Sequence, residues 1–116
     1  MSYDLAVAVK VEGCDKYAVI RCPEFANPTY NLADMFCACM EWDYELGEYY
    51  PAEKYVRVLE TGIKELYTHQ EAYEQYLPEN GWGTFKDAIE SLESWRSCIY
   101  ECAEEIPIEC LYICWG

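Results

Sequence analysis

Hydrophobic and polar residues alternate in two short segments near the start of the chain. Residues 3–11 (YDLAVAVKV) alternate and are rich in valine, which is typical of a half-buried strand. Residues 12–16 supply Gly13 and Asp15 for a turn, and residues 17–22 (YAVIRC) have the pattern of a returning strand. The alternation therefore predicts a β-hairpin.

Apolar residues then recur with a helical period. Residues 32–42 predict a short helix with Asn31 as its N-cap, and residues 52–67 predict a second helix whose first turn follows Pro51. Residues 70–77 predict a short third helix. Thr84 and Asp87 form an approximate capping box for the longest helix, which Pro107 ends. The apolar stripe of this helix consists of Phe85, Ala88, Ile89, Leu92, Trp95, Ile99 and Cys102.

The chain closes with residues 108–115 (IECLYICW), whose apolar character predicts a last strand. Strands at both ends with helices between them indicate an α+β fold. We expect the N-terminal hairpin and the C-terminal strand to form a small antiparallel or mixed sheet, with three to four helices packed on one face. The length of 116 residues fits a single domain over residues 1–116.

The net charge limits the classes of partner that the chain can bind. The chain has 8 Lys and Arg against 22 Asp and Glu, which gives a net charge of −14. This excess argues against direct binding to nucleic acid or to an anionic membrane, since both require positive potential. A hydrophobic content of 53% also excludes a disordered acidic tail.

The acidic residues are grouped rather than evenly spread. The densest block is residues 41–50 (EWDYELGEYY), and a second block follows Arg96. Carboxylates match the cations of Arg and Lys, and aromatic rings offer stiff contact area. On the long helix, Asp87, Glu90, Glu101 and Glu104 avoid the apolar stripe, so these carboxylates could form a row. The candidate partner-binding residues are Glu41, Asp43, Tyr44, Glu45, Glu48, Tyr49, Tyr50, Trp82, Glu101, Glu104 and Glu105.

Simpler interpretations stay open for these residues. Acidic helix faces are usually a solvated surface that keeps a small protein soluble, and tyrosines near a tryptophan are often packed. Trp82 lies between two glycines, which can present the indole to a partner. The same indole can instead fold onto the core.

The expected redox state of the eight cysteines depends on the cellular compartment of the protein. The first ten residues lack a basic region followed by a long apolar run, and no apolar stretch is long enough for a membrane span, so we expect a cytoplasmic protein. Reduced, buried thiols are the expectation in that setting. Two alternatives stay open: a disulfide (Cys98 with Cys114 or Cys102 with Cys110) under oxidising conditions, and a tetrathiolate metal site made by these four residues.

Catalytic motifs are not apparent in the sequence. The chain has no Gly-rich phosphate loop, no nucleophile elbow and no His-Glu-x-x-His pattern, and His69 is the only histidine. We therefore expect a protein that is not an enzyme and that needs no cofactor or metal.

Six short stretches carry a resemblance to known proteins: residues 30–32, 35–36, 42–44, 47–50, 80–83 and 106–115. In these stretches the chain resembles small proteins encoded by phages and prophages of Gram-positive bacteria. In size and charge the chain is also similar to phage anti-CRISPR proteins, small acidic domains that occupy the nucleic-acid groove of a CRISPR effector. This similarity implies a role but assigns no residue.

Charge and resemblance together lead to one expectation. The chain is expected to be a non-enzymatic, phage-encoded inhibitor of a bacterial defence nuclease in the host cytoplasm, which blocks the basic groove of a CRISPR effector as an acidic nucleic-acid mimic. The alternative is a protein–protein interaction module, such as a phage assembly or regulatory subunit, that binds through exposed aromatic residues.

Overall fold

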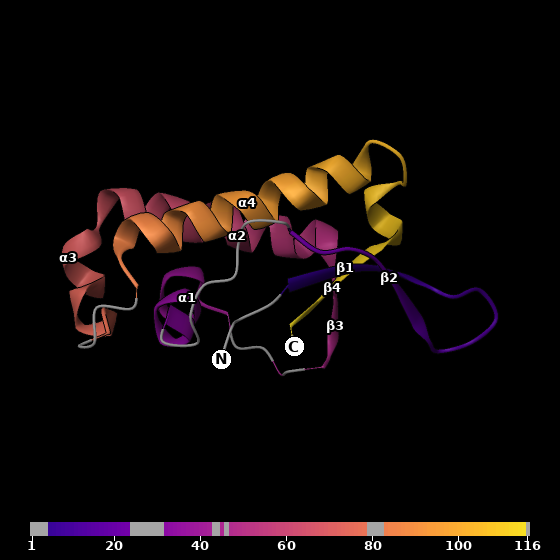
Figure 1. Cartoon of the computed structure of the whole chain (residues 1–116), viewed down its shortest axis with the longest axis horizontal. Coiled ribbons are helices and arrows are strands. Elements are labelled where there is room, and N and C mark those ends of the chain that lie inside the picture. Colours follow the sequence, from indigo (N-terminus) through magenta and orange to yellow (C-terminus); the bar gives the residue numbers. More distant parts are fainter. Residues whose placement is uncertain (1–4, 24–31, 43–44, 46, 79–82, 116) are drawn as a thin grey trace.

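The computed structural model (Figure 1) describes residues 5–23, 32–42, 45, 47–78 and 83–115. Its sheet consists of β1 (Leu5–Lys10), β2 (Tyr17–Arg21), β3 (Tyr49–Pro51) and β4 (Leu111–Trp115). All neighbouring pairs are antiparallel, in the order β2-β1-β4-β3. The predicted hairpin is β1 and β2, and the last strand pairs beside it. The predicted α+β class is confirmed.

The helices are α1 (Ala33–Met40), α2 (Ala52–Thr68), α3 (Gln70–Tyr73) and α4 (Phe85–Ala103), with the 3-10 turns η2 (Glu74–Tyr76) and η3 (Ile108–Cys110). Figure 1 shows α2 and α4 side by side along the long axis, with α3 at one end and the hairpin turn at the other. The third predicted helix is thus only one α-helical turn followed by a 3-10 turn. The closing strand begins at Leu111 because residues 108–110 form η3.

The predicted capping box of α4 is confirmed. The Thr84 hydroxyl accepts the Asp87 N–H at 3.1 Å, and the Asp87 carboxylate accepts the Thr84 N–H at 3.1 Å. This exchange satisfies two of the amide hydrogens that a helix start leaves unpaired. Asn31, the predicted cap of α1, lies outside the described residues.

One face of the sheet supports the core. Leu5, Val7 and Val9 of β1 pair with Trp115, Ile113 and Leu111 of β4. The side chains of the residues between them point to the opposite face of the sheet. Helices α2 and α4 pack on this face, and α1 packs on α2. Aromatic residues fill the centre, where the rings of Trp95 and Trp115 meet edge to face at 4.4 Å. Phe85, predicted in the apolar stripe, is only half-buried.

Helices α1 and α2 approach closely at Gly62. A Cβ at this position would lie 2.6 Å from Cγ of Met40 and 3.3 Å from Sγ of Cys39. Only a residue without a side chain fits this contact.

The sequence pattern did not predict β3. The strand has three residues, ends at a proline and follows Gly47, so it shows no alternation long enough to detect. Within the described part of the chain, no helix is both long and apolar enough to cross a membrane.

Candidate functional site

Two tyrosines of the first acidic block, Tyr49 and Tyr50, lie on opposite faces of the sheet, because side chains alternate along β3. Tyr50 pairs with Ile113 and turns toward the core, where its ring meets the edge of Trp42 at 5.3 Å. Its hydroxyl accepts the backbone N–H of Glu45 at 2.8 Å. Tyr50 therefore stabilises the segment that carries Glu45, and its predicted partner-binding role stays a prediction.

Tyr49 lies on the opposite face of the sheet. Its ring stacks on Tyr17 at 4.0 Å and 6°, and Tyr17 meets the edge of Tyr112 at 5.0 Å. Ala8 pairs with Tyr112 on this face and is fully buried, although the helices cover the other face. Tyr17, Tyr49 and Tyr112, which we call the outer tyrosine cluster, therefore lie on the side of the sheet that the helices leave uncovered.

Glu41 ends α1 in a left-handed conformation, with φ 51° and ψ 44°. This position at a helix C-terminus favours glycine or asparagine, because a Cβ clashes with the neighbouring carbonyl. The Glu41 side chain is exposed, as are Glu45 and Glu48. Asp43 and Tyr44 of the same block, and Trp82 of the Gly-Trp-Gly loop, lie outside the described residues.

The second acidic block lies where α4 ends and the chain turns into η3 (Figure 1). Glu101, Glu104 and Glu105 are exposed around the last turn of α4, and Glu109 is exposed in η3. We call these four residues the C-terminal acidic cluster. No basic residue occupies the last turn of α4.

The backbone under this cluster is well fixed. The amides of Glu104 and Glu105 donate to the carbonyls of Glu101 and Cys102, at 3.3 and 3.2 Å. Ile106 and Ile108 pack against the core on either side of Pro107. The four carboxylates therefore project from a rigid corner, so binding would order few additional groups.

The predicted carboxylate row along α4 is interrupted. Asp87 is held in the capping box, Glu90 lies 3.9 Å from Lys86, and Glu101 lies 3.0 Å from Arg21. Helical spacing places Ser94 and Ser97 between the two ends of the row. The face thus carries two separate acidic ends, not a continuous line of charge.

Two tyrosine–glutamate pairs that the sequence did not reveal join α2 to α4. Tyr67 donates to Glu93 at 2.8 Å, and Tyr100 donates to Glu60 at 2.7 Å. Their rings are 60% and 44% exposed, respectively, so the hydrogen bonds hold two aromatic side chains at the surface. These hydrogen bonds raise the pKa of both phenols. Sequence spacing carries no signal for them, since they depend on how the two helices pair.

Glu65 contacts two neighbours near the C-terminal end of α2. Tyr73 donates to its carboxylate at 3.0 Å, and Nδ1 of His69 lies 3.1 Å from it. Burial, followed by this hydrogen bond, raises the pKa of Tyr73 to about 12. His69 is the exposed residue that ends α2. This group stabilises the turn into α3.

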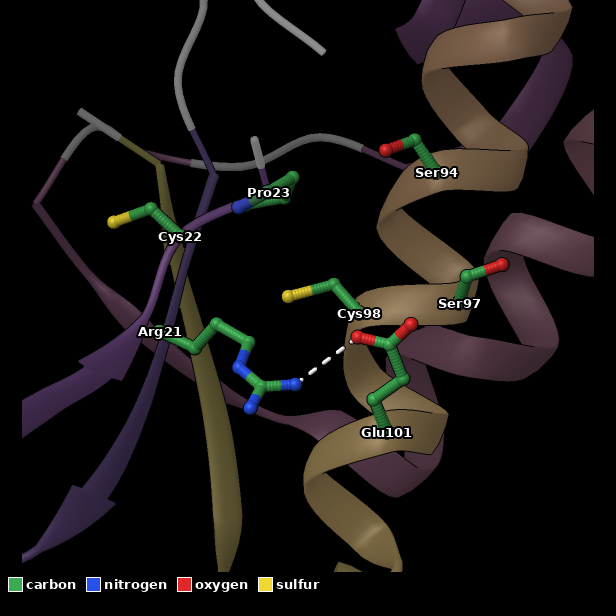
Figure 2. A pocket seen from close by; sticks show the side chains of 7 residues that line it. All are labelled: Arg21, Cys22, Pro23, Ser94, Ser97, Cys98 and Glu101. Carbon is green, nitrogen blue, oxygen red and sulfur yellow. Dashed lines mark hydrogen bonds and ion pairs between the residues drawn. The ribbon is translucent and has the colours of Figure 1, made fainter. Parts of the chain in front are cut away.

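A cleft of about 400 Å³ lies between the end of β2 and one face of α4. Figure 2 shows the Arg21 guanidinium and the Glu101 carboxylate facing each other across it. The Ser94 hydroxyl and the Cys98 thiol point toward the cleft, whereas the Cys22 thiol and the Ser97 hydroxyl point away. Because Glu101 also belongs to the C-terminal acidic cluster, the cleft and the cluster adjoin.

The cysteines divide into core and surface thiols. All eight are free, with Cys39, Cys98 and Cys102 buried and Cys14, Cys22 and Cys110 exposed. Burial raises the pKa of Cys39 and of Cys98 to about 12, so these thiols are protonated at neutral pH. The buried-thiol expectation therefore holds for only part of the set. In the described ranges, no group of three or more His, Cys, Asp or Glu side chains is arranged to hold a metal ion.

Comparisons with protein-family models, with curated proteins and with solved structures find no match to this chain.

Proposed function

We propose that this protein is a non-enzymatic, phage-encoded inhibitor that occupies the basic nucleic-acid groove of a bacterial defence nuclease, a CRISPR effector, as an acidic mimic. One observation carries the proposal: exposed glutamates occupy helix C-termini, where their charge opposes folding. Such positions favour cations, because a helix has a partial negative charge at its C-terminus.

The unfavourable placement occurs in both predicted acidic blocks. Glu101, Glu104 and Glu105 surround the last turn of α4, which has no basic residue. Glu41 ends α1, whose last turn also lacks one, and it adopts a left-handed backbone conformation. Each carboxylate near a helix C-terminus that has no cation beside it costs roughly 0.3–1 kcal/mol. This cost applies to Glu41, Glu104 and Glu105, whereas Arg21 lies 3.0 Å from Glu101. A surface selected for stability alone would avoid these choices, so they support a binding role.

The net charge is weakly compensated within the fold. Sixteen carboxylate side chains are exposed among the described residues. The ion pairs within those residues are Lys10–Asp15, Arg21–Glu101, Lys86–Glu90 and the pair of Glu65 with His69. Most of the exposed carboxylates are thus available to the guanidinium and ammonium groups that line a nucleic-acid groove.

The test uses purified, guide-loaded CRISPR effector nucleases from Gram-positive hosts and a fluorescent target DNA. We expect the protein to displace DNA from an effector and excess DNA to displace the protein. We also expect inhibition to weaken at least tenfold as salt rises from about 50 to 200 mM, since binding of this kind is led by charge.

A pair of triple variants locates the contact. Glu101→Gln/Glu104→Gln/Glu105→Gln removes three charges from the C-terminal acidic cluster and should weaken inhibition at least tenfold. Glu53→Gln/Glu71→Gln/Glu74→Gln has the same net charge, changes exposed residues elsewhere and should retain inhibition. Equal loss in both variants, or inhibition that DNA does not compete with, would contradict the proposal.

The second candidate function is an interaction module that binds a protein partner through aromatic residues. Tyr67 and Tyr100 favour it, because they are exposed and held in place by Glu93 and Glu60. Binding of this kind should change little with salt. Loss of binding in Tyr67→Ala/Tyr100→Ala, with no loss in the C-terminal triple variant, would select this alternative.

A further inference from the structure

We infer that the cleft between β2 and α4 is a subsite for one arginine side chain of the basic partner, and that Arg21 of this chain occupies part of that subsite until the partner arrives. The inference rests on the proposed function, since it names the group that the partner presents to the C-terminal acidic cluster.

The Arg21–Glu101 contact already shows which chemistry the cleft accepts. Nη1 of Arg21 lies 3.0 Å from Oε2 of Glu101, a charge-assisted hydrogen bond through one nitrogen and one oxygen. A guanidinium has five N–H donors in a planar fork, and a carboxylate can accept two of them side by side. The Glu101 carboxylate can therefore bind an incoming guanidinium more fully than this contact does.

The contact is easily exchanged. The side chains of Arg21 and Glu101 are 45% and 62% exposed, so water screens the pair. Exposed pairs of this kind contribute little to stability. Arg21 also lies on β2, an edge strand of the sheet, so releasing its side chain leaves the ladder between β1 and β2 intact.

The rest of the lining fits the remainder of an arginine side chain. The Ser94 hydroxyl points toward the cleft and can accept a further N–H (Figure 2). Pro23 and Cys98 line the cleft as well and give apolar atoms for the methylene stem. Lysine offers a point charge without the planar fork, so the cleft should prefer arginine.

If Arg21 competes with the partner's arginine for the cleft, removing Arg21 should increase the affinity of the cleft for an arginine side chain. A substitution that removes positive charge from an acidic protein strengthens its attraction to any cation, wherever the residue lies. Removal of Arg21 should add to this general effect, because it also vacates the Glu101 carboxylate. Arg57→Gln is the matched control, since Arg57 is exposed on α2 and its loss changes the net charge equally.

The experiment titrates the isotopically labelled full-length protein with N-acetyl-arginine amide, and separately with N-acetyl-lysine amide, and follows amide resonances by NMR. We expect saturable shifts at Cys22, Ser94, Ser97 and Glu101, with lysine at least threefold weaker. Arg21→Gln should bind the arginine probe about threefold more tightly than Arg57→Gln does, as expected for loss of an exposed pair. Glu101→Gln should abolish the shifts.

Thermal unfolding of each variant shows whether the fold is retained, and Arg21→Lys provides a milder replacement with intermediate affinity. Shifts that do not saturate, or equal affinities for Arg21→Gln and Arg57→Gln, would overturn the inference. If the cleft fails this test while DNA-competitive inhibition persists, the subsite is wrong and the proposed function stands. If the arginine probe binds as described but no nuclease is inhibited, the proposed function is wrong and only the cation subsite stands.

Discussion

The rings of Tyr17 and Tyr49 stack at 4.0 Å although their strands, β2 and β3, form the two edges of the sheet. The contact therefore spans the two central strands on the side that the helices leave uncovered. The contact gives Tyr49 a packing role, and the partner-binding role predicted from the sequence stays a prediction.

Replacing Tyr49 tests this assignment. Tyr49→Ala removes a stacked ring and exposes Ala8, so we expect it to lower the free energy of unfolding by about 1–2 kcal/mol. Tyr67→Ala is the control, because the Tyr67 ring is 60% exposed, and it should cost under about 1 kcal/mol. Urea unfolding followed by fluorescence measures both variants. Equal losses would show that the outer tyrosine cluster adds nothing beyond a surface ring.

The close contact at Gly62 predicts whether an alanine at this position raises or lowers the free energy of unfolding. Replacing a helical glycine with alanine normally stabilises a protein by up to about 1 kcal/mol. Here the added Cβ would lie 2.6 Å from Cγ of Met40, so the α1–α2 contact must shift. We expect Gly62→Ala to destabilise the protein by about 1–2 kcal/mol in urea unfolding. A stabilised variant would mean that Met40 moves aside without cost.

The two ends of α4 should respond oppositely to loss of a carboxylate. Asp87→Asn weakens the capping box and removes a favourable charge at the helix start, so we expect a loss of about 1 kcal/mol. Glu104→Gln removes an unfavourable charge at the helix end, so we expect a gain of about 0.3–1 kcal/mol.

Chemical denaturation at low salt measures both α4 variants. The same sign in both would contradict the helix-end argument on which the proposed function depends. The nuclease assay then tests the function of the same variant. Glu104→Gln should inhibit the nuclease less well although its fold is more stable.

The buried thiols give a prediction on pH. Burial raises the pKa of Cys39 and Cys98 from 9.0 to about 12, so their neutral forms contribute stability that is complete below pH 9. That contribution is lost as pH rises toward 12. In iodoacetamide at pH 8, Cys14, Cys22 and Cys110 should react within minutes, while Cys39, which is buried in the core, reacts only as fast as the protein opens. Mass spectrometry of digested samples identifies the labelled positions, and equal labelling of Cys39 and Cys14 would refute the packing described for α1.

Secondary structure was largely predictable because its signals are local. Thr84 and Asp87, three residues apart, marked the start of α4, and the alternation over residues 3–11 marked β1. Strand β3 was missed because its three residues carry no period. Its consequence, that Tyr49 and Tyr50 face opposite ways, was missed with it.

The functional surface was less predictable because its parts meet only in three dimensions. Sequence grouping identified Glu101, Glu104 and Glu105 as one block, but it gave no sign that Arg21 lies against Glu101, 80 residues away. The left-handed conformation of Glu41 could not be predicted from the sequence either, because this conformation at a helix end is typical of glycine or asparagine and not of glutamate. The position of β2 beside α4 brings Arg21 to Glu101.

The pairing of Leu5 with Trp115 has a consequence for how the protein is made. About 110 residues separate these partners, so β1 cannot acquire its central neighbour until β4 has left the ribosome. A nascent chain that has released only the hairpin, α1 and α2 still exposes the apolar side of β1. Slow, late closure of the sheet would make the incomplete chain dependent on chaperones, and its many carboxylates would help to keep it from aggregating during that interval.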